Sequence, residues 1–466
     1  MKSFELSFKS ILMLTVAAFV FGSCGDFKKS SVVTPPSLGS VDFTRFVSLG
    51  NSLTAGYQSG ALYESAQKYS FPAQIARQAG VADSAFQQPL ISEPGIGGRM
   101  KILNLNGPVI GTDPPDAGTP LNTLLSRPYN NLGVPGAVLF DLTDTASFAG
   151  KAMPPRSNPF FQIVLRSSGF GSSPVAQASA LHPTFMTVWI GANDVLGYAT
   201  SGGTVGTMGP GSGPTDVPTF SYLYNQTMSA VLSGASGAKI AVANIPDVTG
   251  IPFFTTIPDS FPNPQTGKAI GPFIVERHHA DGTLHAEPIN ARTDYILLTA
   301  IDSLNAKVGV PAPYGTGRPL PDEYVLDSSE VATVETAIDG YNAAIANFAS
   351  NNSAKVVLVD AHTALQNFAK YGFVGQGVVL NASYISGGFF GLDGVHPTSQ
   401  GYAYVANIFI GAINQHFGSN ISLVPISSVP SSIVLGKRTA QEIMWPEIHY
   451  SDLRQMLGLI QQNGSR

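Results

Sequence analysis

Residues 43–56 read FTRFVSLGNSLTAG, an apolar run with β-branched residues that is followed at once by a turn of small residues. Short apolar runs of this kind are typical of buried strands in parallel sheets. Three similar runs lie at Phe185–Ile190 (FMTVWI), Lys239–Asn244 (KIAVAN) and Lys355–Asp360 (KVVLVD), and we expect a further strand at Tyr129–Val134. Residues 43–49 are therefore predicted to form the first strand of a parallel sheet of several strands.

Helical patterns alternate with these runs. Four stretches have the composition and length of helices: Ser70–Gln78, Phe220–Ser233, Val331–Ser350 and Ser399–His416. Strands that alternate with helices predict an α/β fold, in which a parallel sheet is covered on both faces. In such sheets, functional side chains gather at the carboxyl ends of the strands.

The composition excludes several classes of protein. The chain has 466 residues, with 25 Lys and Arg against 30 Asp and Glu, so its formal net charge is −5, which argues against a nucleic-acid-binding protein. Hydrophobic residues make up 44% of the chain, too many for disorder over most of its length. A single cysteine excludes an internal disulfide framework and any zinc or iron–sulfur site built from cysteines.

The N-terminus has the pattern of a secretion signal. Ile11–Gly22 is an apolar run of about 18 Å as a helix, too short to cross a bilayer core of about 30 Å. Phe21–Cys24 resembles a bacterial lipobox, which implies a signal peptide over residues 1–23, lipidation of Cys24 and a tether over residues 24–41. We therefore expect an exported protein, anchored by lipid to the bacterial outer membrane on its periplasmic or cell-surface face. The alternative is an ordinary signal peptide followed by a free thiol.

We expect one α/β domain over residues 42–420, with a C-terminal extension of unknown role over residues 421–466. The domain carries two long insertions, at about 80–127 and 249–322, which are rich in Pro, Gly and Asn. Structureless loops of that length are uncommon in compact domains, so we expect ordered walls or a cover over a site. The aromatic residues of the second insertion either form an apolar wall or plug it onto the core; these are Phe253, Phe254 and Phe261.

A serine and a histidine have the local settings that nucleophilic catalysis requires. Ser52 follows the first strand on a turn of small residues, where its hydroxyl is exposed at the edge of the sheet. Asp393 lies three residues before His396, with Gly394 between them, so the carboxylate can fold back onto Nδ1 of the imidazole. Nε2 would then be free to face the serine. The other histidines lack such a partner, and we expect no catalytic role for them: His182, His278, His279, His285, His362, His416 and His449.

Two further motifs follow strands. Asn193, in WIGAND, can aim its side-chain amide into the site as an oxyanion-hole donor, or can simply cap a helix. Gly136, in NLGVPGA, allows a backbone N–H to approach a substrate oxygen, and Gly133 is the alternative glycine in that motif. Each signal is weak alone, because such turns are common.

Taken together, the order Ser, Gly, Asn, Asp-x-x-His resembles the SGNH, or GDSL-type, hydrolase family over roughly residues 43–417. The resemblance implies a flavodoxin-like three-layer α/β/α sandwich with a small parallel sheet. It implies a nucleophile at Ser52, a general base at His396 with its carboxylate partner Asp393, and no metal or organic cofactor. The oxyanion hole would comprise the N–H groups of Ser52 and Gly136 and the side chain of Asn193.

The chain departs from the family pattern at Asn51, where an aspartate is usual; we expect activity to be retained. The function implied is a serine esterase or lipase that cleaves lipid, short-chain acyl or acetylated-glycan esters through an acyl-enzyme. The alternative is a non-catalytic surface lipoprotein that binds glycans or lipids on a hydrolase scaffold. The natural substrate, the acyl chain length and the oligomeric state stay open at this point.

Overall fold

A computed structural model describes residues 37–104, 109–146, 158–204, 213–263, 265–279 and 281–431. The predicted signal peptide, Cys24 and most of the tether lie outside these residues, as does the C-terminal extension beyond residue 431. Among the described helices, none combines the length and the apolar character needed to cross a bilayer.

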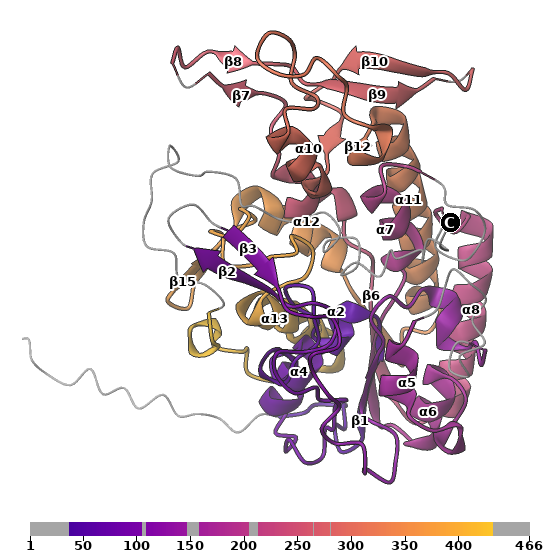
Figure 1. Ribbon diagram of the computed structural model, residues 1–466. Coiled ribbons are helices and arrows are strands. Elements are labelled where there is room, and N and C mark those ends of the chain that lie inside the picture. Colours follow the sequence, from indigo (N-terminus) through magenta and orange to yellow (C-terminus); the bar gives the residue numbers. More distant parts are fainter. Residues whose placement is uncertain are drawn as a thin grey trace, which may run out of the picture. The chain divides into compact units, whose positions relative to one another are not determined.

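The centre of the fold is a parallel sheet of five strands in the order β4–β1–β5–β6–β13 (Figure 1). Counted along the chain within this sheet, the order is 2-1-3-4-5, which is the doubly wound order of flavodoxin-like folds. The predicted flavodoxin-like sandwich is therefore confirmed. The strands are β1 (Phe46–Gly50), β4 (Asn131–Gly133), β5 (Phe185–Trp189), β6 (Lys239–Ala243) and β13 (Val356–Val359).

Successive side chains of a strand point to opposite faces of the sheet, so they pack into two apolar layers, one on each face. In β6, Ile240 and Val242 belong to one cluster of buried residues, and Ala241 and Ala243 belong to the other. Three helices cover the second face: α4 (Phe71–Gln78), α12 (Ala361–Tyr371) and α13 (Ser399–Phe417). The first face is covered by α6 (Pro174–Ala180), α7 (Asn193–Thr200), α8 (Val217–Gly234) and α11 (Ser328–Asn351).

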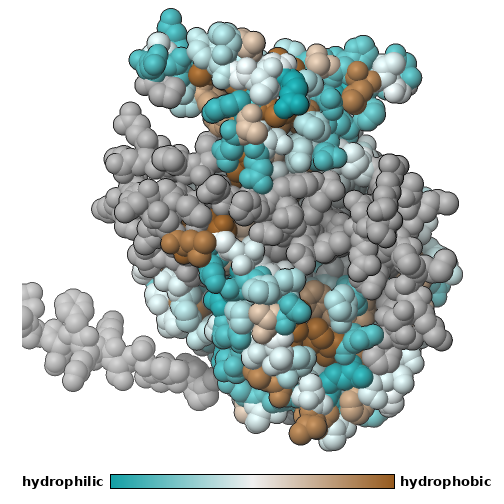
Figure 2. Space-filling model, viewed as in Figure 1, coloured by the Kyte–Doolittle hydropathy of each residue, from teal (hydrophilic) through white to brown (hydrophobic). Residues whose placement is uncertain are grey.

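Both stretches predicted as insertions carry secondary structure of their own. Within residues 80–127, β2 (Met100–Asn104) and β3 (Val109–Thr112) form an antiparallel hairpin. The second stretch holds two more hairpins, whose surface is largely hydrophilic in Figure 2. The elements of the second stretch are α9 (Pro252–Thr255), β7 (Phe261–Pro262), β8 (Ala269–Ile270), β9 (Ile274–His278), β10 (Leu284–Pro288), β11 (Tyr295–Ile296) and α10 (Ile301–Asn305).

One charged side chain ties the β9–β10 hairpin to the rest of the domain. Arg277 of β9 forms an ion pair and hydrogen bond with the buried carboxylate of Asp294. A second carboxylate, Asp327 at the N-cap of α11, lies 3.9 Å from the same guanidinium group. Because a buried charge is stable only with partners, these contacts hold β9 against the start of α11.

The aromatic residues of the second insertion pack against the core, which is one of the two alternatives left open by the sequence, and none of them lines the cavity beside Ser52. Phe253 and Phe254 of α9 are fully buried within the main apolar cluster, with rings 5.2 Å apart at 70°. Phe261 is only half-buried and packs against Phe273. Phe253 and Phe254 therefore attach the insertion to the core and do not form an exposed wall.

We predict that Phe253→Ala lowers the free energy of unfolding by about 3–5 kcal/mol, because it leaves a cavity in a close-packed core. Phe140→Ala is the matched control: its side chain is 40% exposed, and the loss should stay below about 1 kcal/mol. Urea unfolding measures both values. Unchanged stability together with a selective loss of activity on long acyl esters would instead assign Phe253 to a substrate wall.

Candidate active site

Ser52 lies at the carboxyl end of β1, as the first residue of the short helix α2 (Ser52–Ala55). Asn51 caps this helix, since its side-chain oxygen accepts a hydrogen bond from the N–H of Leu53 at 3.1 Å. An aspartate oxygen could accept the same bond. The departure from the usual aspartate therefore leaves the local geometry of the turn intact.

The turn at residues 393–396 brings the predicted base and carboxylate to this serine. Nε2 of His396 lies 2.9 Å from Oγ of Ser52, and Nδ1 lies 3.0 Å from Oδ2 of Asp393. All three side chains are buried or nearly so. The distances form a continuous hydrogen-bonded path from carboxylate to imidazole to hydroxyl, across 344 residues of sequence.

The carboxylate of Asp393 accepts four hydrogen bonds, all from N–H groups. Oδ1 accepts from the backbone of Val395 at 3.0 Å and of His396 at 2.9 Å, while Oδ2 accepts from Gly60 at 2.8 Å and from the imidazole. Burial alone would raise the pKa of Asp393, but the interaction with His396 and these hydrogen bonds outweigh it and lower the pKa. The arrangement keeps Asp393 ionised and fixes the orientation of the imidazole.

The loop after α2 supplies residues that the sequence did not single out. Ser59 has a φ of 50°, in the left-handed region that non-glycine residues rarely adopt. This conformation places its hydroxyl 3.1 Å from the N–H of Leu392 and leads into Gly60, the donor to Asp393. The ring of Tyr57 packs 4.8 Å from that of His396. The Ser59–Gly60 turn was a detectable signal, but its partner lies 333 residues away.

Of the predicted oxyanion donors, Ser52 and Asn193 line the same cavity, whereas Gly136 is not among its lining residues. Asn193, at the start of α7, shares a cavity with Ser52, and its amide donates one hydrogen bond to the carbonyl of Ala137 at 2.8 Å. Gly136, the residue before Ala137, has a φ of 76°. Within the described part of the chain, no acceptor pairs with the backbone N–H of Ser52 or Gly136. The N–H of Gly133, by contrast, already donates to Asn131.

A cavity of about 110 Å³ opens beside Ser52, His396 and Asn193. Its wall is predominantly apolar and combines residues from α2, α7, α12 and the loops after β6 and β15 (Val378–Leu380). The volume is of the order of the cavities that accept a small hydrocarbon group. Apolar members of the wall include Leu53, Leu196, Val248, Ile251, Leu365 and Phe390.

No group of three or more potential metal ligands forms around Ser52 in the described residues. The group that these residues do contain lies on the β9–β10 hairpin. The groups that the described residues place at the serine are a hydroxyl, an imidazole, a carboxylate and several amide N–H groups. These are the parts that nucleophilic acyl transfer requires.

Comparison with known proteins gives one family. The family model described as GDSL-like lipase/acylhydrolase matches residues 46–409, which includes the serine turn, the glycine and asparagine motifs and the aspartate–histidine turn. No curated protein and no solved structure matches the chain.

We predict that Asp393→Asn lowers the free energy of unfolding at pH 7 by roughly 2–4 kcal/mol, because an amide nitrogen cannot accept from N–H donors. Since folding lowers the pKa of Asp393, its stabilising effect is complete above the ordinary carboxyl pKa of about 3.9 and is lost as the pH falls further. The difference between wild type and variant should therefore shrink below about pH 4.

Urea unfolding from pH 3 to 7 measures this difference, with Asp83→Asn, at an exposed aspartate, as the matched control. A difference that stayed constant across this range would mean that the ionised carboxylate does not stabilise the turn.

Proposed function

The chain belongs to the GDSL-like lipase/acylhydrolase family and acts on ester bonds, and we propose that it does so through an acyl-enzyme formed on Ser52. The observation that carries this proposal is the pair of distances at His396, 2.9 Å to the serine oxygen and 3.0 Å to the carboxylate of Asp393. A base within hydrogen-bond reach of the nucleophile, itself oriented by a third group, is the geometry of an activated serine.

In the first half of the reaction, Oγ of Ser52 attacks the ester carbonyl carbon while Nε2 of His396 takes the hydroxyl proton. Asp393 stabilises the imidazolium that results. The carbon–oxygen bond to the leaving alcohol then breaks, and His396 returns the proton to the alcohol oxygen. In the second half, a water molecule attacks the acyl-enzyme with His396 again as base, which releases the acid and restores Ser52.

The tetrahedral intermediates carry a negative oxygen that needs preorganised donors. We assign the backbone N–H groups of Ser52 and Gly136 and the second amide hydrogen of Asn193 to this oxygen. Two observations support the choice of Gly136 over Gly133: the N–H of Gly136 has no acceptor in the described chain, whereas that of Gly133 is already engaged. The bond from Asn193 to Ala137 holds the amide beside the Gly136 loop.

The apolar cavity favours an acyl group with a hydrocarbon chain over acetyl alone. Burial of apolar area contributes about 25 cal/mol per Å², so each methylene that enters the cavity strengthens binding. A volume of about 110 Å³ limits the chain that can be enclosed to a few carbons. Esters of short to medium fatty acids are therefore the substrate class that we propose.

Retention of the complete set of hydrogen-bonded side chains disfavours the alternative of a binding protein on a hydrolase scaffold. A surface that only binds ligand gains nothing from a buried carboxylate, whose desolvation is costly. We also propose that the mature chain begins at a lipidated Cys24 in a bacterial outer membrane. This proposal rests on the lipobox-like residues 21–24 and on the absence of any other cysteine from the sequence.

We predict that Ser52→Ala lowers kcat on a small chromogenic ester by at least about 10³-fold, since only the oxyanion donors remain. The urea midpoint should change little, because the substitution removes a single hydroxyl and its one hydrogen bond to His396. Ser65→Ala, at an exposed serine of the same region, should keep wild-type kcat. Turnover by Ser52→Ala at the wild-type rate would overturn the assignment of the nucleophile.

For the cavity, we predict that Leu365→Trp lowers kcat/KM on butyryl esters roughly tenfold relative to acetyl esters, because the larger side chain occupies acyl space. Leu124→Trp is the control, as Leu124 is 96% exposed. A chain-length series of chromogenic esters supplies the measurement. Equal losses on all chain lengths would place the acyl group elsewhere.

For the N-terminus, we predict that Cys24→Ser leaves the precursor uncleaved or releases the protein from the membrane fraction, since the anchoring acyl chains are lost. Ser31→Ala, within the tether, should fractionate as wild type. Cell fractionation and intact-mass spectrometry measure the outcome. An unmodified thiol at Cys24 of the wild-type protein would refute the anchor.

A further inference from the structure

The β9–β10 hairpin of the second insertion carries a group of side chains that ester hydrolysis does not use. Its sequence runs RHHADGTLHAEP over residues 277–288. In the antiparallel register, His285 pairs with Arg277 and Glu287 pairs with Val275, and the N–H of His279 donates to the carbonyl of Thr283. Because side chains alternate between faces, His279, His285 and Glu287 all project from the same face of the hairpin.

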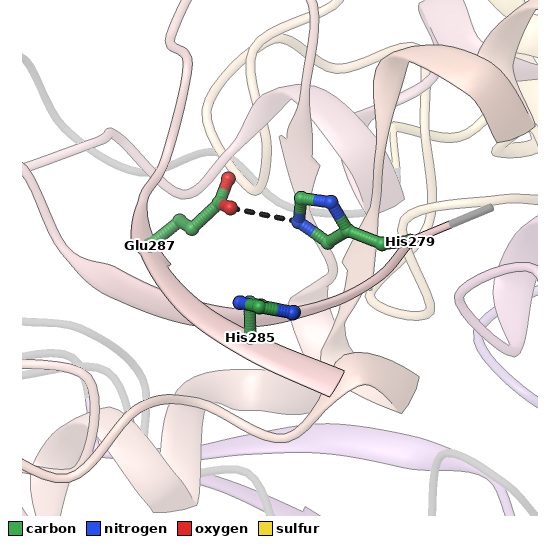
Figure 3. Close-up of side chains that lie close together, drawn as sticks. All are labelled: His279, His285 and Glu287. Atoms are coloured by element: carbon green, nitrogen blue, oxygen red, sulfur yellow. Dashed lines mark hydrogen bonds and ion pairs between the residues drawn. The ribbon is translucent and has the colours of Figure 1, made fainter. Parts of the chain in front are cut away.

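These three side chains meet above the hairpin (Figure 3). Nε2 of His279 lies 2.7 Å from Oε1 of Glu287, and the rings of His279 and His285 lie 4.4 Å apart at 48°. One potential ligand atom from each residue lies within 4.8 Å of the other two. We propose that His279, His285 and Glu287 bind one divalent transition-metal ion, with Zn²⁺ as the best match.

The ligand types select the metal. Imidazole nitrogens favour Zn²⁺, Cu²⁺ or Ni²⁺, whereas Mg²⁺ and Ca²⁺ prefer sites made of oxygen atoms. Two imidazoles and a carboxylate are one of the ligand sets that hold Zn²⁺ with a water molecule in the fourth position. Bond lengths of about 2.0–2.2 Å require ligand atoms roughly 3.3 Å apart. Both histidines are exposed, so their side chains can rotate to close the wider separations, and His285 would exchange its hydrogen bond with Thr283 for the metal ion.

The charges around the group are compatible with a cation. A positive group lies close by: Nε of Arg277 is 3.7 Å from Oε2 of Glu287. Its charge is compensated by Asp294 and Asp327, so a metal ion beside Glu287 does not face an unpaired guanidinium. The carboxylate of Asp281 lies in the adjoining turn, where it accepts from Thr283, and adds negative charge.

A metal ion at this position joins both strands close to the turn that connects them. Arg277, which lies opposite His285 in the register, holds the hairpin against Asp294 and Asp327. The ion would add a link between the two strands, and it would stabilise the folded insertion increasingly as the metal concentration rises above the Kd. This role is independent of the chemistry at Ser52.

The test uses the full chain, treated with a chelator and titrated with ZnCl₂ in a calorimeter. We expect one equivalent of Zn²⁺ to bind the wild type, and the Kd to rise at least about tenfold in His279→Ala and in His285→Ala, because each loses a ligand. Added Zn²⁺ should raise the thermal midpoint of the wild type but not that of the two variants.

His278→Ala is the matched control, because His278 is adjacent in sequence and its imidazole lies 3.5 Å from Asp322, on the other face of the strand. It should bind Zn²⁺ as the wild type does. Ester turnover by all three variants should equal that of the wild type, which shows that they fold. Absence of zinc binding by the wild type at 100-fold excess over protein would overturn the proposal, as would equal affinity in the ligand variants or loss of binding in His278→Ala.

Discussion

The buried carboxylate of Asp393 sets the requirement that the rest of this site meets. An ionised group away from water is stable only when its oxygens are fully hydrogen-bonded. Here two donors come from its own turn, one from the imidazole of His396 and one from Gly60, in the loop that follows α2. The same interaction that keeps the carboxylate ionised therefore also joins the two segments that carry the serine and the histidine.

That turn is supported from a third direction, by the second insertion. The N–H of Phe253 donates to the carbonyl of Gly394 at 3.0 Å, and the side chain of Phe253 is fully buried in the core below it. The insertion is thus part of the support of the site. Its β9–β10 hairpin is anchored separately, through Arg277 and the start of α11.

The sheet could be predicted from sequence because each buried strand is a short apolar run, and such runs are visible without knowledge of their neighbours. The predicted strand at Lys239–Asn244, for instance, differs from β6 by one residue. Ser52, Asp393 and His396 could be singled out for a similar reason: each lies in a local turn with its own pattern. The structure places them together, and their catalytic roles stay a proposal.

Other features depend on contacts that no local pattern contains. From the sequence, Phe253 could either line the site or pack in the core, since an aromatic residue near a proline is compatible with both positions. Helix α12 was not anticipated, although Leu365 contributes to the cavity. His279 and His285 looked unremarkable because they are six positions apart in the sequence, and only the antiparallel register places them on the same face as Glu287. Nothing in the sequence around Gly60 indicated that its N–H donates to Asp393.

The contact between Phe253 and Gly394 also constrains how this sequence can evolve. A side chain at position 394 would meet the backbone nitrogen of Phe253 at 3.1 Å, and Gly394 has a φ of 68°, which other residues rarely adopt. Insertion and turn are therefore coupled: a lineage that shortened the insertion would leave the carbonyl of Gly394 without its donor. A change in one segment therefore requires a compensating change in the other, so the insertion is a structural part of the candidate site and not an exchangeable appendage.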